Sequence, residues 1–152
     1  MKTTLIVILS LFAYVGLNAQ SDKIVGYWLT AEKTSQVKIF KATNGKYYGK
    51  VFSIEDPESR KELDSNNPDP EKRKEKKIGL RLLNSFEYNE KENTWENGTI
   101  YDPDNGKTYD CYMWFEDDPD KLQIKGYVLG MRMLGRETTW YRDKGPREEW
   151  TE

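Results

Sequence analysis

The side chains that could carry out chemistry form a restricted set, because the 152 residues include no histidine. A Ser-His-Asp triad, a Cys-His pair, histidine-ligated zinc and histidine-ligated haem are therefore excluded within one chain. Carboxylates, lysines, tyrosines, hydroxyl groups and a single cysteine, Cys111, remain for catalysis. We interpret Cys111 as a small buried residue rather than a nucleophile.

Paired carboxylates are the one catalytic arrangement that the remaining residue types readily support, since glycoside hydrolysis uses two acidic side chains. Asp110 and Glu137 are candidates, because both lie on predicted strands. Their separation is not visible in the sequence, and nothing around them indicates a raised pKa. The sequence therefore favours a binding protein over an enzyme, with a histidine-free carboxylate hydrolase as the least favoured function.

A binding site is predicted from alternation in the second half of the chain. Residues 121–128 place Leu122, Ile124 and Val128 on one face, between polar neighbours. If this face lines the inside of a closed sheet, the same alternation brings in residues from 107–116 and 133–142. An apolar cavity with a few polar groups is typical of small-molecule sites, whereas a core filled by the same rings is the alternative. The candidate ligand-binding residues are Trp28, Tyr109, Met113, Arg136 and Trp140.

Arg136 has two alternative roles on such an inward face. A buried guanidinium must be paired, and Glu137 points to the opposite side of the same strand. Arg136 can brace the ring of Trp28 through a cation–π contact worth roughly 0.5–2 kcal/mol. It can instead receive a ligand carboxylate or phosphate.

A cluster of side-chain oxygens between positions 64 and 69 could suit a hard cation such as calcium. It lacks the glycine and the distal glutamate of an EF-hand loop, and turn formation before a helix explains the same residues. We therefore predict neither a metal nor a cofactor. The residues of this cluster are Asp64, Asn66, Asn67 and Asp69.

The elements that must position these residues are about eight short strands. The aromatic content of 13% and frequent turn signals, such as Asn44-Gly45 and residues 102–106, are typical of an all-β protein. Mostly tight connections predict a single antiparallel up-and-down β-barrel, and a β-sandwich is the alternative. The predicted strands are 24–31, 36–41, 46–54, 79–88, 94–101, 107–116, 121–128 and 133–142. We expect the first and last to pair, so that an arginine of the last lies across Trp28.

One connection, residues 55–78, is long, and 15 of its 24 residues are charged. Asp69-Pro70-Glu71 is typical of a helix start, so we predict a short helix from Pro70 to Lys76 that caps one mouth of the barrel. A mobile, solvated loop is the alternative.

The N-terminus has the order of a secretory signal: a basic start, an apolar run over 5–17 and a small residue for cleavage, Ala19. We predict a signal peptide at 1–19, a β-barrel domain at 20–142 and a polar tail at 143–152, in the periplasm or secreted. The mature chain then carries 23 Lys+Arg (24 less Lys2) against 26 Asp+Glu, a net charge of −3. Such a balance favours no nucleic acid, and no membrane-spanning segment follows the cleavage site.

Several motifs in order resemble one family over essentially the whole mature chain: Gly26-Tyr27-Trp28, the segments 63–70 and 101–109, Leu134-Gly135-Arg136 and Thr139-Trp140-Tyr141-Arg142. The chain resembles the secreted bacterial family called domain of unknown function 2147. The resemblance implies an exported one-domain β protein and no activity. By a weaker analogy of architecture, the Gly-x-Trp start and late arginine are similar to those of lipocalins.

These observations predict an exported module that holds a small amphipathic ligand or a cell-envelope component in a lipocalin-like barrel. The alternative is a structural or interaction protein with a filled core. The ligand and the oligomeric state are not specified by the sequence.

Overall fold

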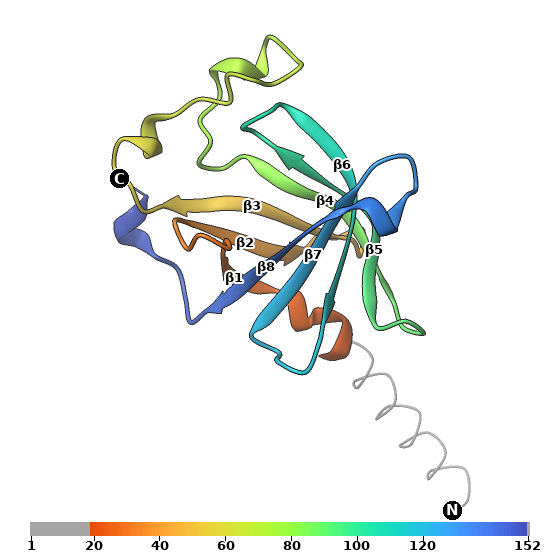
Figure 1. Ribbon diagram of the computed structural model, residues 1–152. Helices are drawn as coiled ribbons and strands as arrows, with labels where there is room; N and C mark the ends of the chain where they lie inside the picture. The colour runs from red at the N-terminus through yellow and green to blue at the C-terminus, as the bar shows by residue number, and fades with distance from the viewer. Residues whose placement is uncertain (1–18, 152) are drawn as a thin grey trace, which may run out of the picture.

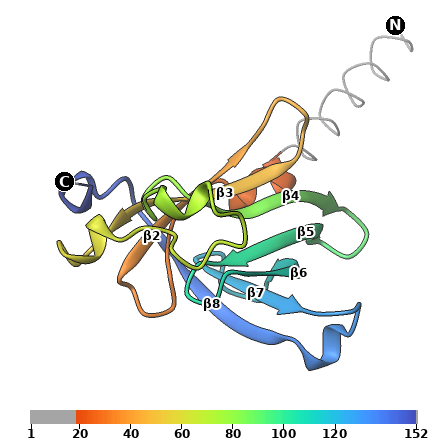
Figure 2. The same ribbon diagram turned by 90° about the horizontal axis from the view of Figure 1, so that it is seen from above.

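The structure, a computed structural model, describes residues 19–151, and their eight strands form one closed antiparallel barrel in sequential order (Figures 1 and 2). The ring shuts where the first strand pairs with the last, with Trp28 opposite Arg142. The predicted up-and-down barrel is thus confirmed, and the sandwich alternative was wrong. The strands are β1 (Gly26–Leu29), β2 (Ser35–Lys41), β3 (Tyr47–Ile54), β4 (Arg81–Asn89), β5 (Thr94–Asp102), β6 (Lys107–Phe115), β7 (Lys121–Tyr127) and β8 (Arg136–Asp143).

The signal peptide predicted for residues 1–19 lies, except for Ala19, outside the described residues. Within residues 19–151, no helix combines the length and the apolar character that crossing a bilayer requires.

One half of the barrel interior is filled by large side chains. Trp28, Trp95, Phe86 and Met113 are all fully buried there, because alternation along each strand turns them toward the barrel axis. Close packing makes a glycine necessary at position 98, since a Cβ there would lie 2.4 Å from the Phe86 ring. This half of the barrel therefore has no room for a ligand.

The filled end is closed by the segment that precedes β1, which forms the 3₁₀ helix η1 (Asp22–Ile24) and lies at the lower end of the barrel in Figure 1. The indole N–H of Trp28 donates a hydrogen bond to the Ile24 carbonyl at 2.8 Å. The indole N–H of Trp95 donates likewise to the Ser21 carbonyl at 2.9 Å. The indole N–H is the only polar group of each of these two core side chains. Both N–H groups are therefore satisfied by carbonyls of the segment that closes this end of the barrel, and these hydrogen bonds hold that segment in place.

The arginine that braces Trp28 is Arg142, whose guanidinium carbon lies 4.3 Å from the ring centroid. It also donates to Asp120 Oδ1 at 2.9 Å and to the Lys23 carbonyl at 2.8 Å. The expected cation–π contact is confirmed, but its assignment to Arg136 was wrong. Arg136 pairs with Gly126 instead, and lies exposed near the opposite end of β8.

The long connection between β3 and β4 is ordered as a clasp rather than a helix. Its arms pair through an antiparallel bridge between Leu63 and Lys76, and Lys77 N donates to the Glu62 carbonyl at 3.0 Å. This pairing extends the chain at 75–77, so the helix predicted for Pro70–Lys76 is reduced to one 3₁₀ turn, η3 (Lys72–Lys74). A second 3₁₀ turn, η2, spans Ser59–Lys61.

The clasp is fastened to the turn between β5 and β6. Asp64 is fully buried and accepts hydrogen bonds from the Tyr101 hydroxyl at 2.7 Å and from Asn67 Nδ2 at 2.6 Å. Gly106 has φ +70°, and a Cβ there would lie 1.9 Å from the Asn66 carbonyl oxygen. The clasp therefore lies at the end of the barrel opposite η1 (Figure 1). It covers the β3–β6 side of that end (Figure 2) and leaves the β7–β8 side open.

The C-terminal residues return along the outside of the barrel. Gln36 on β2 is buried there, and its side-chain amide donates to Asp143 Oδ2 at 2.7 Å and to the Gly145 carbonyl at 2.9 Å. Arg147 N donates back to Gln36 Oε1 at 3.0 Å. The tail thus buries a polar side chain of the outer face and satisfies it completely.

Candidate functional site

A cavity of about 480 Å³ opens at the end of the barrel opposite η1. Its volume falls in the range of small-molecule sites, roughly 300–1,000 Å³. Strands β5 to β8 supply most of its wall, and the turns after β1, β5 and β7 supply its rim. The lining includes Ile100, Tyr101, Tyr109, Ile124, Val128, Leu134, Arg136, Thr138 and Trp140.

The cavity has an apolar base and a rim of mixed polarity. Ile124 and Trp140 lie deepest and are almost fully buried. Tyr109 stands nearer the rim, where its hydroxyl accepts a hydrogen bond from Asn105 Nδ2 at 3.1 Å. The base is thus apolar, and the rim adds the polar groups of Tyr109 and Arg136 beside the apolar Val128 and Leu134, a lining that matches a ligand with one apolar and one polar end.

Arg136 supplies the cation of the cavity. It is exposed at the mouth, and no ion-pair partner contacts it within residues 19–151. Its neighbour Glu137 points outward and lies 3.9 Å from Lys125 Nζ. The guanidinium is therefore free to bind an anionic group at the rim.

The five predicted ligand-binding residues separate into two groups. Tyr109, Arg136 and Trp140 line the cavity. Trp28 and Met113 do not, because they belong to the filled half, where both are fully buried. Alternation correctly turned all five inward, but it carries no information on height along the barrel axis.

Sequence reasoning placed Val128 on the inward face but missed that the whole connection between β7 and β8 forms part of the cavity rim. Val128 and Leu134 line the cavity from this connection, which includes the 3₁₀ turn η4 (Arg132–Leu134). The predicted last strand began at Met133, but the observed β8 begins at Arg136. Residues 129–131 were predicted as a short connection, but Val128 and Met133-Leu134 were assigned to the flanking strands, so the apolar run 128–134 was not recognised as one feature.

The four residues proposed as a cation site use their side chains to shape the clasp. Asn67 Oδ1 accepts from Asp69 N at 2.9 Å, and Asp69 Oδ1 accepts from Glu71 N at 3.1 Å. Asn66 Nδ2 donates to the Asp104 carbonyl at 2.9 Å, and Asp64 holds Tyr101. In the described part of the chain, no three Cys, Asp or Glu side chains gather as metal ligands would.

The carboxylates considered for hydrolysis lie on the outer surface. Asp110 pairs across the sheet with Tyr127, and Glu137 pairs with Lys125, so strand β7 runs between the two. Both side chains are exposed, and neither lines the cavity. This pair therefore has no shared cleft in which a glycosidic bond could be held.

Cys111 is fully buried between the two halves of the barrel, and burial raises the pKa of its thiol to about 12. Thiols react as thiolates, so we expect Cys111 to be inert toward Ellman's reagent at pH 8 in the folded protein. One equivalent of thiol should react once urea unfolds the chain. Rapid reaction before unfolding would show that the interior opens to solvent.

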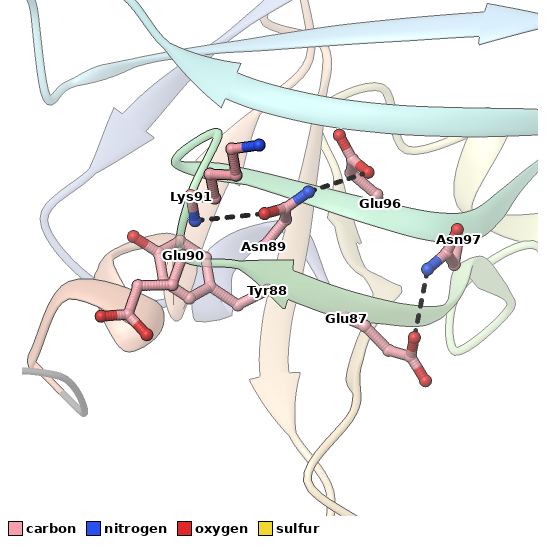
Figure 3. A pocket seen from close by; sticks show the side chains of 7 residues that line it. All are labelled: Glu87, Tyr88, Asn89, Glu90, Lys91, Glu96 and Asn97. Atoms are coloured by element: carbon pink, nitrogen blue, oxygen red, sulfur yellow. Dashed lines mark hydrogen bonds between the residues drawn. The ribbon is translucent and has the colours of Figure 1, made fainter.

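Two further depressions lie outside the barrel interior. One follows the β4–β5 hairpin (Figure 3), where Asn89 Oδ1 accepts from Lys91 N at 3.1 Å and Asn97 Nδ2 donates to Glu87 at 3.2 Å. These polar groups thus form hydrogen bonds within the hairpin that stabilise its turn and strand pairing. The other lies between the clasp and β4, with Lys72, Lys76 and Arg81 at its edge. Neither has the enclosed apolar base of the cavity between β5 and β8.

Both the sequence and the fold of the chain are similar to those of known proteins. The sequence model of a family described as "Uncharacterized protein conserved in bacteria (DUF2147)" matches residues 26–142. Among solved structures, the chain is similar to protein HP1028 of Helicobacter pylori, which is described as belonging to the lipocalin family. The two share 24% identity with a TM-score of 0.66, over 79% of this chain and 82% of that one, which is a likeness of fold. No curated protein matches the chain.

Proposed function

Because the chain belongs to the bacterial family DUF2147 and folds as a lipocalin-like barrel, we propose that its open end binds a small amphipathic ligand. The observation that carries the proposal is a barrel sealed at one end by η1 and hollow at the other. Lipocalin barrels are of the size that holds one small ligand. The fold and the cavity both support this function.

The lining indicates the kind of ligand. Ile124, Trp140 and Leu134 offer apolar contact for a hydrocarbon or ring, and Arg136 offers a cation at the rim. A ligand that enters with its apolar end first places an anionic group beside Arg136. We therefore propose an amphipathic molecule with a carboxylate or phosphate head, such as a component of the cell envelope.

We place this function in the periplasm or outside the cell, since residues 1–19 have the pattern of a cleaved signal. Fractionation of the native bacterium tests that placement directly. Detection of the protein only in the cytoplasm, with residues 1–19 still attached, would contradict it.

Replacing Arg136 with alanine should weaken binding of decanoate about tenfold, since one charge-assisted hydrogen bond is worth about 1.5 kcal/mol or more. Decanol, which lacks the charge, should bind both proteins equally. Arg136 is exposed, so the melting temperature should stay unchanged. Lys50→Ala, which removes an exposed cation of β3 away from the cavity, is the matched control. Isothermal titration calorimetry measures the affinities.

A second variant tests the cavity itself. Thr138→Trp fills the space above Trp140 and should abolish binding of both decanoate and decanol. Binding that survives this substitution unchanged would contradict the proposed site. Native mass spectrometry of the protein purified from its own envelope then identifies the natural ligand.

A further inference from the structure

The described chain exposes seven large apolar side chains, and five of them belong to one connection. Leu129, Met133 and Leu134 are 87%, 93% and 79% exposed, and Val128 and Met131 accompany them. We call residues 128–134 the apolar loop. The other two residues, Val25 and Leu63, lie singly elsewhere. Single exposed apolar residues are ordinary, whereas a group of five in seven positions indicates an interaction site.

The apolar loop has a defined backbone shape, and its ribbon stands out from the barrel beyond β7 and β8 (Figures 1 and 2). Met131 N donates to the Val128 carbonyl at 3.0 Å, and Leu134 N donates to the Met131 carbonyl at 3.1 Å. Two successive turns therefore satisfy much of the backbone locally. Leu129 has φ +53°, which is unfavourable for a bulky residue. The loop therefore holds the exposed Leu129 side chain in solvent in an unfavourable backbone conformation.

An aromatic belt lies on the outer face of β6 and β7, beside the apolar loop. The rings of Tyr112 and Trp114 stack with centroids 5.0 Å apart, and Tyr127 meets Tyr112 at 6.1 Å. The guanidinium of Arg132 folds back over Tyr112, 4.8 Å from its centroid. Apolar side chains at a tip, followed by aromatic and basic side chains, match the order of environments from the hydrocarbon of a bilayer to its headgroups.

We propose that the apolar loop inserts into the surface of a lipid bilayer, with Tyr112, Trp114 and Tyr127 at the level of the headgroups. A lipid surface fits better than a protein partner because the exposed side chains belong to one seven-residue connection that stands out from the barrel (Figures 1 and 2). Protein interfaces instead need a broad, complementary surface of about 800 Å² on each partner. The only charged side chain within the loop is Arg132, and its guanidinium is turned back onto the belt.

The attraction is apolar rather than electrostatic. The chain has a net charge of −2, and Arg132 already lies 3.5 Å from Glu96. Binding should therefore need no anionic lipid and should persist at high salt, where surface charges are screened. This distinguishes the proposal from charge-driven association with a membrane.

Docking also orients the cavity. Val128 and Leu134, at the two ends of the apolar loop, line its rim. Insertion of the tip therefore turns the mouth toward the lipid. The inference goes beyond ligand binding and does not depend on it, because the tip can insert whether or not the cavity is occupied.

Flotation with vesicles of phosphatidylcholine, which carry no net charge, tests the docking. The protein is used from Gln20 onward, which keeps η1 and every strand and removes the apolar run at 5–17. It should float with the vesicles equally well at 0.1 M and 1 M salt. The L129S/M133S variant should bind at least tenfold more weakly, since each fully exposed side chain contributes about tenfold to partitioning. V25S/L63S is the matched control and should float like the parent.

A fluorophore reports the insertion itself. In M133C, an environment-sensitive dye can be attached selectively because Cys111 is buried. Its emission should shift to the blue on addition of vesicles, whereas the same dye on L63C should not respond. Failure of the parent protein to float, equal flotation of L129S/M133S, or loss of flotation above 0.5 M salt would each overturn the proposal. So would a dimer of the parent that L129S/M133S dissociates, with no vesicle binding, because the loop would then join two copies.

Discussion

Replacing Trp28 with alanine is expected to lower the free energy of unfolding by about 3–5 kcal/mol. The indole is fully buried, packs 5.9 Å from the Phe115 ring centroid and donates to the Ile24 carbonyl. Its loss leaves a cavity, removes the ring on which the Arg142 guanidinium lies and removes the hydrogen bond that holds η1 across the end of the barrel. Urea denaturation followed by circular dichroism measures the change.

The matched control is Trp114→Ala, which removes the same side chain from the outer face of β6. Trp114 is only half-buried and stacks on Tyr112, so its truncation should cost about 1 kcal/mol. Equal destabilisation by the two substitutions would contradict the view that the barrel is organised around the buried indole.

Replacing Asp64 with alanine should cost about 2–3 kcal/mol, because it leaves the Tyr101 hydroxyl and the Asn67 amide without their buried acceptor. Both hydrogen bonds are short, at 2.7 and 2.6 Å, and burial together with the Asp64 contact raises the pKa of Tyr101 well above its usual value. The clasp should then detach from the β5–β6 turn. Chemical denaturation and limited proteolysis within residues 55–78 measure the two effects.

Asp69→Ala is the control for this prediction, since Asp69 belongs to the same clasp but is exposed, and its side chain accepts from the Glu71 backbone N–H. It should cost about 1 kcal/mol or less and leave the clasp resistant to protease. A clasp that stays protected in Asp64→Ala would show that its backbone bridge alone is sufficient to hold it.

The sequence predicted the features that depend on local pattern. Alternation in 107–116 and 121–128 correctly placed Met113 and Ile124 inside, because a strand leaves each side chain only two directions. Short turns between most strands predicted the meander, and the count of eight predicted closure. Each of these inferences needs only a few neighbouring residues.

The pairing of the first strand with the last was predicted, but the side-chain contacts that depend on the exact register of distant segments were not. Arg136 and Arg142 share one parity, and only the stagger between β1 and β8 decides that Arg142 reaches Trp28. The helix signal at Asp69-Pro70-Glu71 was real, but the bridge from Leu63 to Lys76 overrode it. Burial of Asp64 required Tyr101, which no local pattern associates with it.

Closure of the ring has a consequence for how the protein is made. Strand β1 pairs with β8 on one edge, with Tyr27 opposite Asp143. The backbone of β1 therefore stays unpaired on this edge until β8 has been synthesised. Until synthesis reaches β8, both β1 and β7 present unpaired edges to which other chains could add. A chain that stops before residue 136 would keep those edges permanently, and aggregation rather than partial activity is its expected fate.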